Sequence, residues 1–154
     1  MDKVRINDKE DVARMLKDIW FCDGEVSPAA FFMRPHLAEF YLSVLREGCE
    51  SFSQDASIVV RGRCDARYAS MNVAQIRNIN FSADIDFTSV DVFSIDNRTL
   101  KSHAGIFLTF NGQTIVAGEP FESFVPVKGM SSEDAMLDIG EQLAFLARNS
   151  IRKL

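Results

Sequence analysis

The sequence SHAGIFLTFNGQTIVA at residues 102–117 is an apolar run interrupted by Asn111-Gly112. Asn-Gly is the strongest short-range signal for a β-hairpin, because a tight type I′ turn needs positive φ at both central residues and these two tolerate it best. The two strands are rich in Ile, Phe, Leu and Val, so at least one of their faces must be covered. We therefore expect the hairpin to lie in the middle of a sheet against which helices pack.

Length and composition limit the number of domains and the kinds of partner that we expect. The 154 residues, of which 47% are hydrophobic, suffice for one domain with a core and are too few for two, so we expect residues 1–154 to form a single domain. The formal net charge is −5 with both signs interspersed, which argues against nucleic acid or an anionic membrane as a partner. No apolar stretch approaches the roughly 20 residues of a spanning helix, so we expect no signal peptide, no membrane anchor and a cytoplasmic location.

The three cysteines, Cys22, Cys49 and Cys64, are odd in number and lack the CxxC or Cys/His spacing of a metal site. They predict neither a disulfide framework nor a zinc site. We expect reduced thiols that are mostly buried, with Cys22 in the core beside Trp20 and Phe21.

Both ends of the chain carry the apolar spacing of an amphipathic helix. Residues 8–21 follow Asn7, which fits an N-cap, and a second pattern starts at Ser131 or Ser132 and runs almost to the C-terminus. Gly140 lies inside the second pattern and costs about 1 kcal/mol relative to alanine unless a neighbour packs closely there. The apolar positions are Val12, Met15, Leu16, Ile19 and Trp20 in the first helix and Met136, Ile139, Leu143, Leu146 and Ile151 in the second.

The middle of the chain predicts most of the sheet. Residues 57–63 have a β-branched run typical of a strand, and residues 81–95 show the clearest alternation of apolar and polar positions. Residues 36–48 fit both a helix and a strand, and we favour the helix; residues 70–79 fit a short helix. Together these patterns predict an α+β fold, in which a mainly antiparallel sheet from about residue 57 to 118 is flanked by N-terminal and C-terminal amphipathic helices.

Two aspartates stand at alternate positions of the predicted strand 81–95. Asp84 and Asp86 project to the same side of a strand, where they can share divalent metal ions that bind nucleotide phosphates, so they are candidate metal ligands. The alternative is that they form the solvated face of a half-buried strand and protect its edge.

The segment Ser82-Ala83-Asp84-Ile85-Asp86-Phe87 resembles the Ser-Asp-Ile-Asp-Leu signature of the nucleotidyltransferase fold. The resemblance covers residues 68–92 and implies a metal-dependent enzyme acting on a nucleotide or another phosphate compound. The family has a Gly-Ser step before its acidic pair, where this chain has Tyr68-Ala69-Ser70 without the glycine. The family's third carboxylate has no clear equivalent, because Asp91 lies too close in the sequence.

His103 opens the hairpin and is the candidate catalytic base of such an enzyme, because an unperturbed imidazole titrates near neutral pH. It would act beside Asp84 or Asp86, although nothing in the sequence brings these residues together. The alternative is a histidine that belongs to the core and has no chemical role.

Arginine replaces lysine through the middle of the chain. Seven arginines and no lysine occur within residues 34–98, and Arg61, Arg63 and Arg67 follow one another closely. Guanidinium groups suit phosphate and carboxylate recognition, so these three are candidate ligand-binding residues for an anionic small molecule. The alternative is that they pair with Asp55 and other nearby aspartates.

A scattered pattern resembles small uncharacterised bacterial and phage proteins. The matching residues are Val26-Ser27 with Ala30-Phe31, Leu42-Ser43-Val44, Ile76-Arg77 and His103-Ala104-Gly105-Ile106. The resemblance implies no activity, but it gives weight to a shared site of Ser27, Arg34, Arg77 and His103, which are polar residues among apolar ones. Arg34 and Arg77 therefore join the candidate ligand-binding residues.

No glycine-rich phosphate loop, nucleophile elbow or HExxH motif is present, and no cofactor is implied. We therefore predict a small intracellular binding or interaction protein, with a second copy of the chain and an anionic small molecule as candidate partners. The alternative is a metal-dependent enzyme in which Asp84 and Asp86 hold the metal and His103 is the base.

Overall fold

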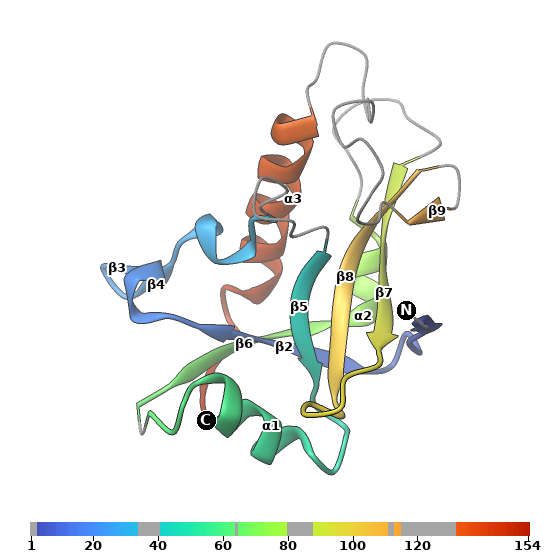
Figure 1. Cartoon of the computed structure of the whole chain (residues 1–154). Helices are drawn as coiled ribbons and strands as arrows, with labels where there is room; N and C mark the ends of the chain where they lie inside the picture. Colours follow the sequence, from blue (N-terminus) through green and yellow to red (C-terminus); the bar gives the residue numbers. More distant parts are fainter. Residues whose placement is uncertain (1–2, 34–40, 64, 80–87, 111–112, 115–131) are drawn as a thin grey trace.

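The computed structural model of the chain describes residues 3–33, 41–63, 65–79, 88–110, 113–114 and 132–154 (Figure 1). Three of the predicted site residues, Arg34, Asp84 and Asp86, lie outside these ranges, as does the predicted Asn111-Gly112 turn.

The fold is α+β, with one large sheet whose neighbouring strands are all antiparallel. The strand order is β1-β7-β8-β5-β2-β6-β10, and β9 pairs with β8. These strands are β1 (Lys3–Arg5), β2 (Asp11–Leu16), β5 (Tyr41–Arg46), β6 (Arg67–Asn72), β7 (Thr88–Ile95), β8 (His103–Phe110), β9 (Gln113–Thr114) and β10 (Ile151–Lys153). A separate pair joins β3 (Phe21–Cys22) to β4 (Glu25–Val26).

The hairpin prediction is confirmed. β8 lies between β7 and β5, inside the sheet, and β9 turns back along it with Thr109 opposite Thr114. β8 is buried along nearly its whole length. The alternation predicted over residues 81–95 is confirmed where the structure describes it, as β7.

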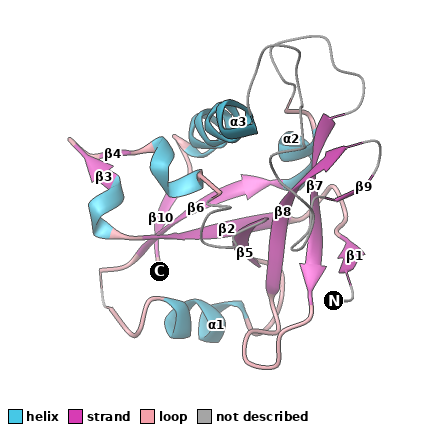
Figure 2. Ribbon diagram, turned by 45° about the horizontal axis from the view of Figure 1, so that its top comes forward, coloured by secondary structure: helices cyan, strands magenta, loops and turns pink. Residues whose placement is uncertain are grey.

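Helices cover both faces of the sheet (Figure 2). One face carries α2 (Val73–Arg77), α3 (Ser132–Ala147) and the 3-10 turn η2 (Pro28–Phe31), whose buried side chains share the larger core cluster with the strands. The other face carries α1 (Phe52–Val59) over a smaller cluster that includes Ala56 and Val60. Among the described residues, no helix is long and apolar enough to cross a membrane.

The N-terminal helix predicted over residues 8–21 is wrong, because β2 occupies this segment and is followed by the 3-10 turn η1 (Asp18–Trp20). β2 is buried on both faces: Val12 and Leu16 belong to the larger core cluster, Ala13 and Met15 to the smaller one. A strand of this kind places apolar residues at adjacent positions, and periodicity alone does not distinguish it from a buried helix.

Two further element predictions are wrong for related reasons. The favoured helix at 36–48 is the strand β5 over its described part, with Leu42 and Val44 in one core cluster and Leu45 in the other. The strand predicted at 57–63 falls partly in helix α1 and partly in the turn that follows it. Ile58 and Val59 are exposed at the end of the helix, whereas Val60 is buried in the smaller cluster. Ser53 and Gln54 lie on the solvated side of the helix, and Asp55 is buried.

The C-terminal helix is confirmed as α3, but it ends at Ala147 and the chain then forms the edge strand β10. Gly140 in α3 is packed against the Phe32 ring, which is the close neighbour that a glycine there requires. The short helix within 70–79 is confirmed as α2. Cys22 is exposed, so its predicted core position is wrong, while Cys49 is half-buried.

Candidate functional site

Three strand termini meet at one end of the sheet. Leu16, the last residue of β2, lies opposite Arg67 at the start of β6, and Arg67 in turn lies opposite Lys153 at the end of β10. Arg152 is the next residue of β10, and Lys17 directly follows β2. The antiparallel register therefore brings cations from three distant parts of the sequence to the same end of the sheet.

The loop between α1 and β6 brings two more arginines to the same end. Arg63 donates from Nη2 to the carbonyl oxygen of Leu16 at 3.1 Å and from Nε to that of Val60 at 3.4 Å. Arg61 is exposed and lies in a tight turn with φ of 54°. We call this group the cationic end and define it as Lys17, Arg61, Arg63, Arg67, Arg152 and Lys153.

Direct ion pairs are few at the cationic end. Within the described part of the chain, its only ion pair joins Arg63 to Asp18 at 3.5 Å, and the Asp18 side chain is itself 67% exposed. The charge of Arg152 also acts on the half-buried Glu47, where burial raises the pKa of the carboxyl and Arg152 partly offsets that rise. Arg67 instead stacks its guanidinium over the Phe21 ring, 3.5 Å from the centroid, and Lys17 lies over the Trp20 ring. Aromatic rings hold such cations by their quadrupole without cancelling the charge.

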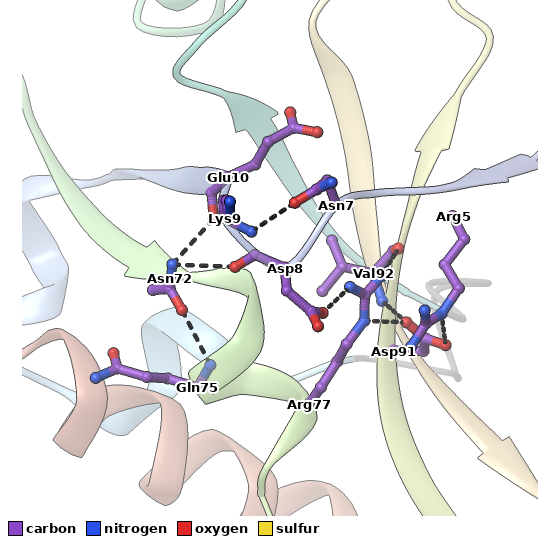
Figure 3. Close-up of polar contacts among 10 residues, drawn as sticks. All are labelled: Arg5, Asn7, Asp8, Lys9, Glu10, Asn72, Gln75, Arg77, Asp91 and Val92. Atoms are coloured by element: carbon purple, nitrogen blue, oxygen red, sulfur yellow. Dashed lines mark hydrogen bonds and ion pairs between the residues drawn. The ribbon is translucent and has the colours of Figure 1, made fainter.

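The arginines at the opposite end of the sheet are paired (Figure 3). Arg77 in α2 donates from Nε to Asp91 at 2.6 Å, from Nη1 to Asp8, and from Nη2 to the carbonyl oxygen of Val92. Arg5 also donates to Asp91. These bonds use all three nitrogens of Arg77 and link the N-terminal segment, α2 and β7. The contacts of Arg77 therefore indicate a structural role.

The same network shifts the pKa of the Asp91 carboxyl. Burial by itself raises the pKa of Asp91, but the hydrogen bonds from Arg77, the Val92 N–H and Arg5 outweigh burial and hold the pKa below its ordinary value. Nearby, Arg46 binds both carboxylate oxygens of Glu10, at 2.8 and 3.0 Å.

His103, the predicted base, is the first residue of β8 and is buried. Its Nε2 lies 2.9 Å from the hydroxyl of the exposed Ser43, and its ring meets the edge of Tyr41. Nδ1 is buried and has no hydrogen-bond partner. Burial lowers the pKa of His103, because the charged imidazolium would lose its hydration.

A buried carboxylate fixes the start of β8. Asp55 in α1 accepts hydrogen bonds from the backbone N–H and hydroxyl of Ser102 and from the hydroxyl of Ser51. Burial raises the pKa of Asp55, but these bonds outweigh it and the pKa lies below its ordinary value. Asp55 therefore binds serines rather than an arginine. None of its hydrogen bonds reaches His103, whose Nδ1 has no hydrogen-bond partner among the described residues. The Ser43–His103 pair accordingly has no third group on Nδ1 to orient the imidazole as a catalytic base.

The sequence-predicted residues are thus distributed over different places. Arg61, Arg63 and Arg67 come together, whereas Arg77 and His103 have separate partners. Ser27, of the predicted shared site, caps η2 by accepting from the Ala29 N–H. The described residues contain no group of three or more metal-ligating side chains. The metal-ligand prediction for Asp84 and Asp86 stays a prediction.

Sequence reasoning missed three members of the cationic end. Lys17 lies within the segment 8–21 whose pattern predicts a helix, and Arg152 and Lys153 lie at the end of the C-terminal helical pattern, so neither pattern places them beside the arginines of residues 61–67. The signal that was present is the arginine cluster at 61–67, but its neighbours became visible only through the strand register.

Comparisons of the chain with models of protein families, with curated proteins and with solved structures find no match.

Proposed function

We propose that this chain is a binding protein that takes an anionic ligand at the cationic end. The observation that carries the proposal is the gathering of six cations that form only one direct ion pair, with an exposed carboxylate, among the described residues of a chain whose net charge is −5. Uncompensated like charges repel one another, so such a cluster is more favourable when an anion lies between them.

The geometry suits phosphate or carboxylate groups. Guanidinium forks bind both groups through two parallel hydrogen bonds, and lysines add point charges. Arg63 is tied to two backbone carbonyl oxygens and Arg67 is stacked on Phe21, so part of the side-chain ordering is already complete before a ligand binds. Arg61 and Lys153 are exposed and available to close on the ligand.

The experiment is a titration of the protein with pyrophosphate, citrate and a short oligothymidylate, followed by calorimetry and by backbone amide shifts. The test variant is Arg61→Gln/Lys153→Gln, and the matched control is Arg98→Gln/Lys101→Gln, which removes the same charge from exposed residues elsewhere. We expect at least one anion to bind, and the test variant to bind it about tenfold more weakly, because two charge-assisted contacts are lost. The control should differ by less than about twofold.

Absence of binding by every anion, or an equal loss in the test and control variants, would overturn the proposal. Higher salt should weaken binding, since the contacts are solvent-exposed ion pairs. Preference for citrate or pyrophosphate would identify a small ligand, while a much tighter complex with the oligonucleotide would identify a polyanion.

We also propose a cytoplasmic setting. The support is the exposed free thiol of Cys22, which persists in a reducing compartment. A second copy of the chain stays a candidate partner, and the molar mass in solution tests it.

A further inference from the structure

A second surface, of opposite charge, lies between α2 and α3. It is an open groove of about 400 Å³. Ile79, Phe145 and Leu146 supply apolar lining, Gln75 stands on the α2 side, and Asp138 and Glu141 place two carboxylates on the α3 side. The groove is therefore apolar in part and rimmed by acids.

The exposed side of α3 carries more apolar surface than the fold requires. Ile139 and Leu143 are fully buried and anchor the helix to the sheet. Phe145 is 62% exposed and Leu137 is 44% exposed, and with Glu141 they form a stripe at spacing i, i+4, i+8 along the solvent side. This stripe borders the groove and adds nothing to the core.

Among the described residues, the acids of the groove have no ion-pair partner. No described lysine or arginine forms an ion pair with Asp138 or Glu141, and Asp138 accepts a hydrogen bond from the side-chain amide of Gln142. The nearest stacked cation, Arg148, lies over the Phe145 ring, 3.6 Å from its centroid, and donates to the Phe145 carbonyl oxygen. The Phe145 ring therefore already receives a guanidinium on one face.

We propose that the α2–α3 groove is a docking site for a cationic segment of a partner protein that inserts an apolar side chain. The apolar lining and Phe145 would receive the apolar anchor, and Asp138 and Glu141 would pair with lysine or arginine on either side of it. An amphipathic segment laid into a groove between helices is a common mode of peptide recognition. The site is separate from the cationic end and does not depend on the anion binding proposed above.

The probe is a fluorescein-labelled peptide of about 12 residues that alternates lysine-rich and leucine-rich turns, a length of about three helical turns. A matched peptide carries glutamate in place of lysine. Affinity is measured by fluorescence anisotropy, and the contact surface by amide shifts of the labelled protein. We expect the lysine peptide to bind and to shift Gln75 and Phe145, and the glutamate peptide not to bind.

Two charge-matched variants decide between a groove and general attraction to an acidic protein. Glu141→Lys should weaken peptide binding about tenfold, because it turns an attraction into a repulsion. Glu50→Lys makes the same charge change at an exposed residue in the turn before α1 and should change binding by less than about twofold.

A second pair tests the apolar anchor. Phe145→Gln should weaken binding about tenfold, since aromatic anchors dominate such interfaces. Ile19→Gln, at a residue that is 83% exposed in η1, should leave it unchanged. Equal losses in both members of either pair, or shifts away from the groove, overturn the docking site.

One outcome would identify a different occupant, and one control separates this proposal from the anion site. If the molar mass of the protein rises with its concentration and added peptide lowers that molar mass again, the groove receives a second copy of the chain, and the partner proposal fails. Arg61→Gln/Lys153→Gln should leave peptide affinity unchanged, so failure of the anion site and failure of the groove are told apart.

Discussion

At the scale of single residues, His103 is held neutral by its surroundings. Its pKa lies below the ordinary value of 6.5 because burial disfavours the charged ring. The unfolded chain therefore binds a proton more readily than the folded protein. The free energy of unfolding should be highest above pH 6.5 and should decrease as the pH falls from there toward the folded pKa.

We expect the variant His103→Gln to remove this part of the pH dependence. Urea unfolding at pH values of about 7.5, 6.5 and 5.5 measures it, since the unfolded imidazole titrates near 6.5. The native protein should lose more stability than the variant between the two lower values. A variant with the same slope as the native protein would show that other groups cause the dependence.

At the scale of elements, the contact between α3 and η2 decides the residue at position 140. A Cβ built on Gly140 would run into the ring of Phe32. We expect Gly140→Ala to lower the free energy of unfolding by about 1–2 kcal/mol, because overpacking costs more than the gain of about 1 kcal/mol in helix propensity. Thermal and urea unfolding measure the change.

Two further variants identify the cause. Gly48→Ala adds a Cβ that meets no atom within 4 Å, so it should leave stability nearly unchanged. Adding Phe32→Leu to Gly140→Ala should recover part of the loss, since a smaller side chain leaves room. If Gly140→Ala is as stable as the native protein, the ring moves aside without cost and the packing argument is incorrect.

At the scale of the whole molecule, the two ends of the sheet differ in how their arginines are paired: Arg77 forms ion pairs at one end, and the cationic end lies at the other. Arg77 joins α2, the N-terminal segment and β7 through Asp8 and Asp91, and its side chain is only 9% exposed. We expect Arg77→Met to lower the free energy of unfolding by about 3 kcal/mol near neutral pH, because it leaves the half-buried Asp91 carboxylate with only the exposed Arg5 as a described ion-pair partner. Arg98→Met, at an exposed residue, is the control for the charge change.

The difference between native protein and Arg77→Met should depend on pH. The pKa of Asp91 is held below its usual 3.8, so the pairing contributes fully above that value and is lost as the pH falls through the lower, folded pKa. Denaturation at about pH 7 and pH 3 measures it, since the carboxylate becomes neutral toward the lower value. A gap that does not narrow at low pH would mean that Arg77 acts by packing alone.

Local patterns predicted the elements whose cause is local. Three signals act between residues that are close in the sequence. They are the apolar run at 102–117 with its Asn-Gly dipeptide, the alternation that leads into 88–95 and the acidic first turn of the C-terminal helix. Ser27 followed by Pro28 is likewise a local signal for a capped turn, and η2 begins there. In each case the backbone preference and the burial pattern agree.

Tertiary structure decided the elements that are buried on two sides and the site that long-range pairing builds. β2 and β5 contribute to both core clusters, so their apolar residues lack a period that identifies a strand. Lys17, Arg67 and Lys153 are brought together only by the antiparallel register of β2, β6 and β10. Sequence alone thus determined the α+β class, the central hairpin and the arginine cluster, while the strand register decided which cations share one surface, because that pairing joins residues far apart in the chain.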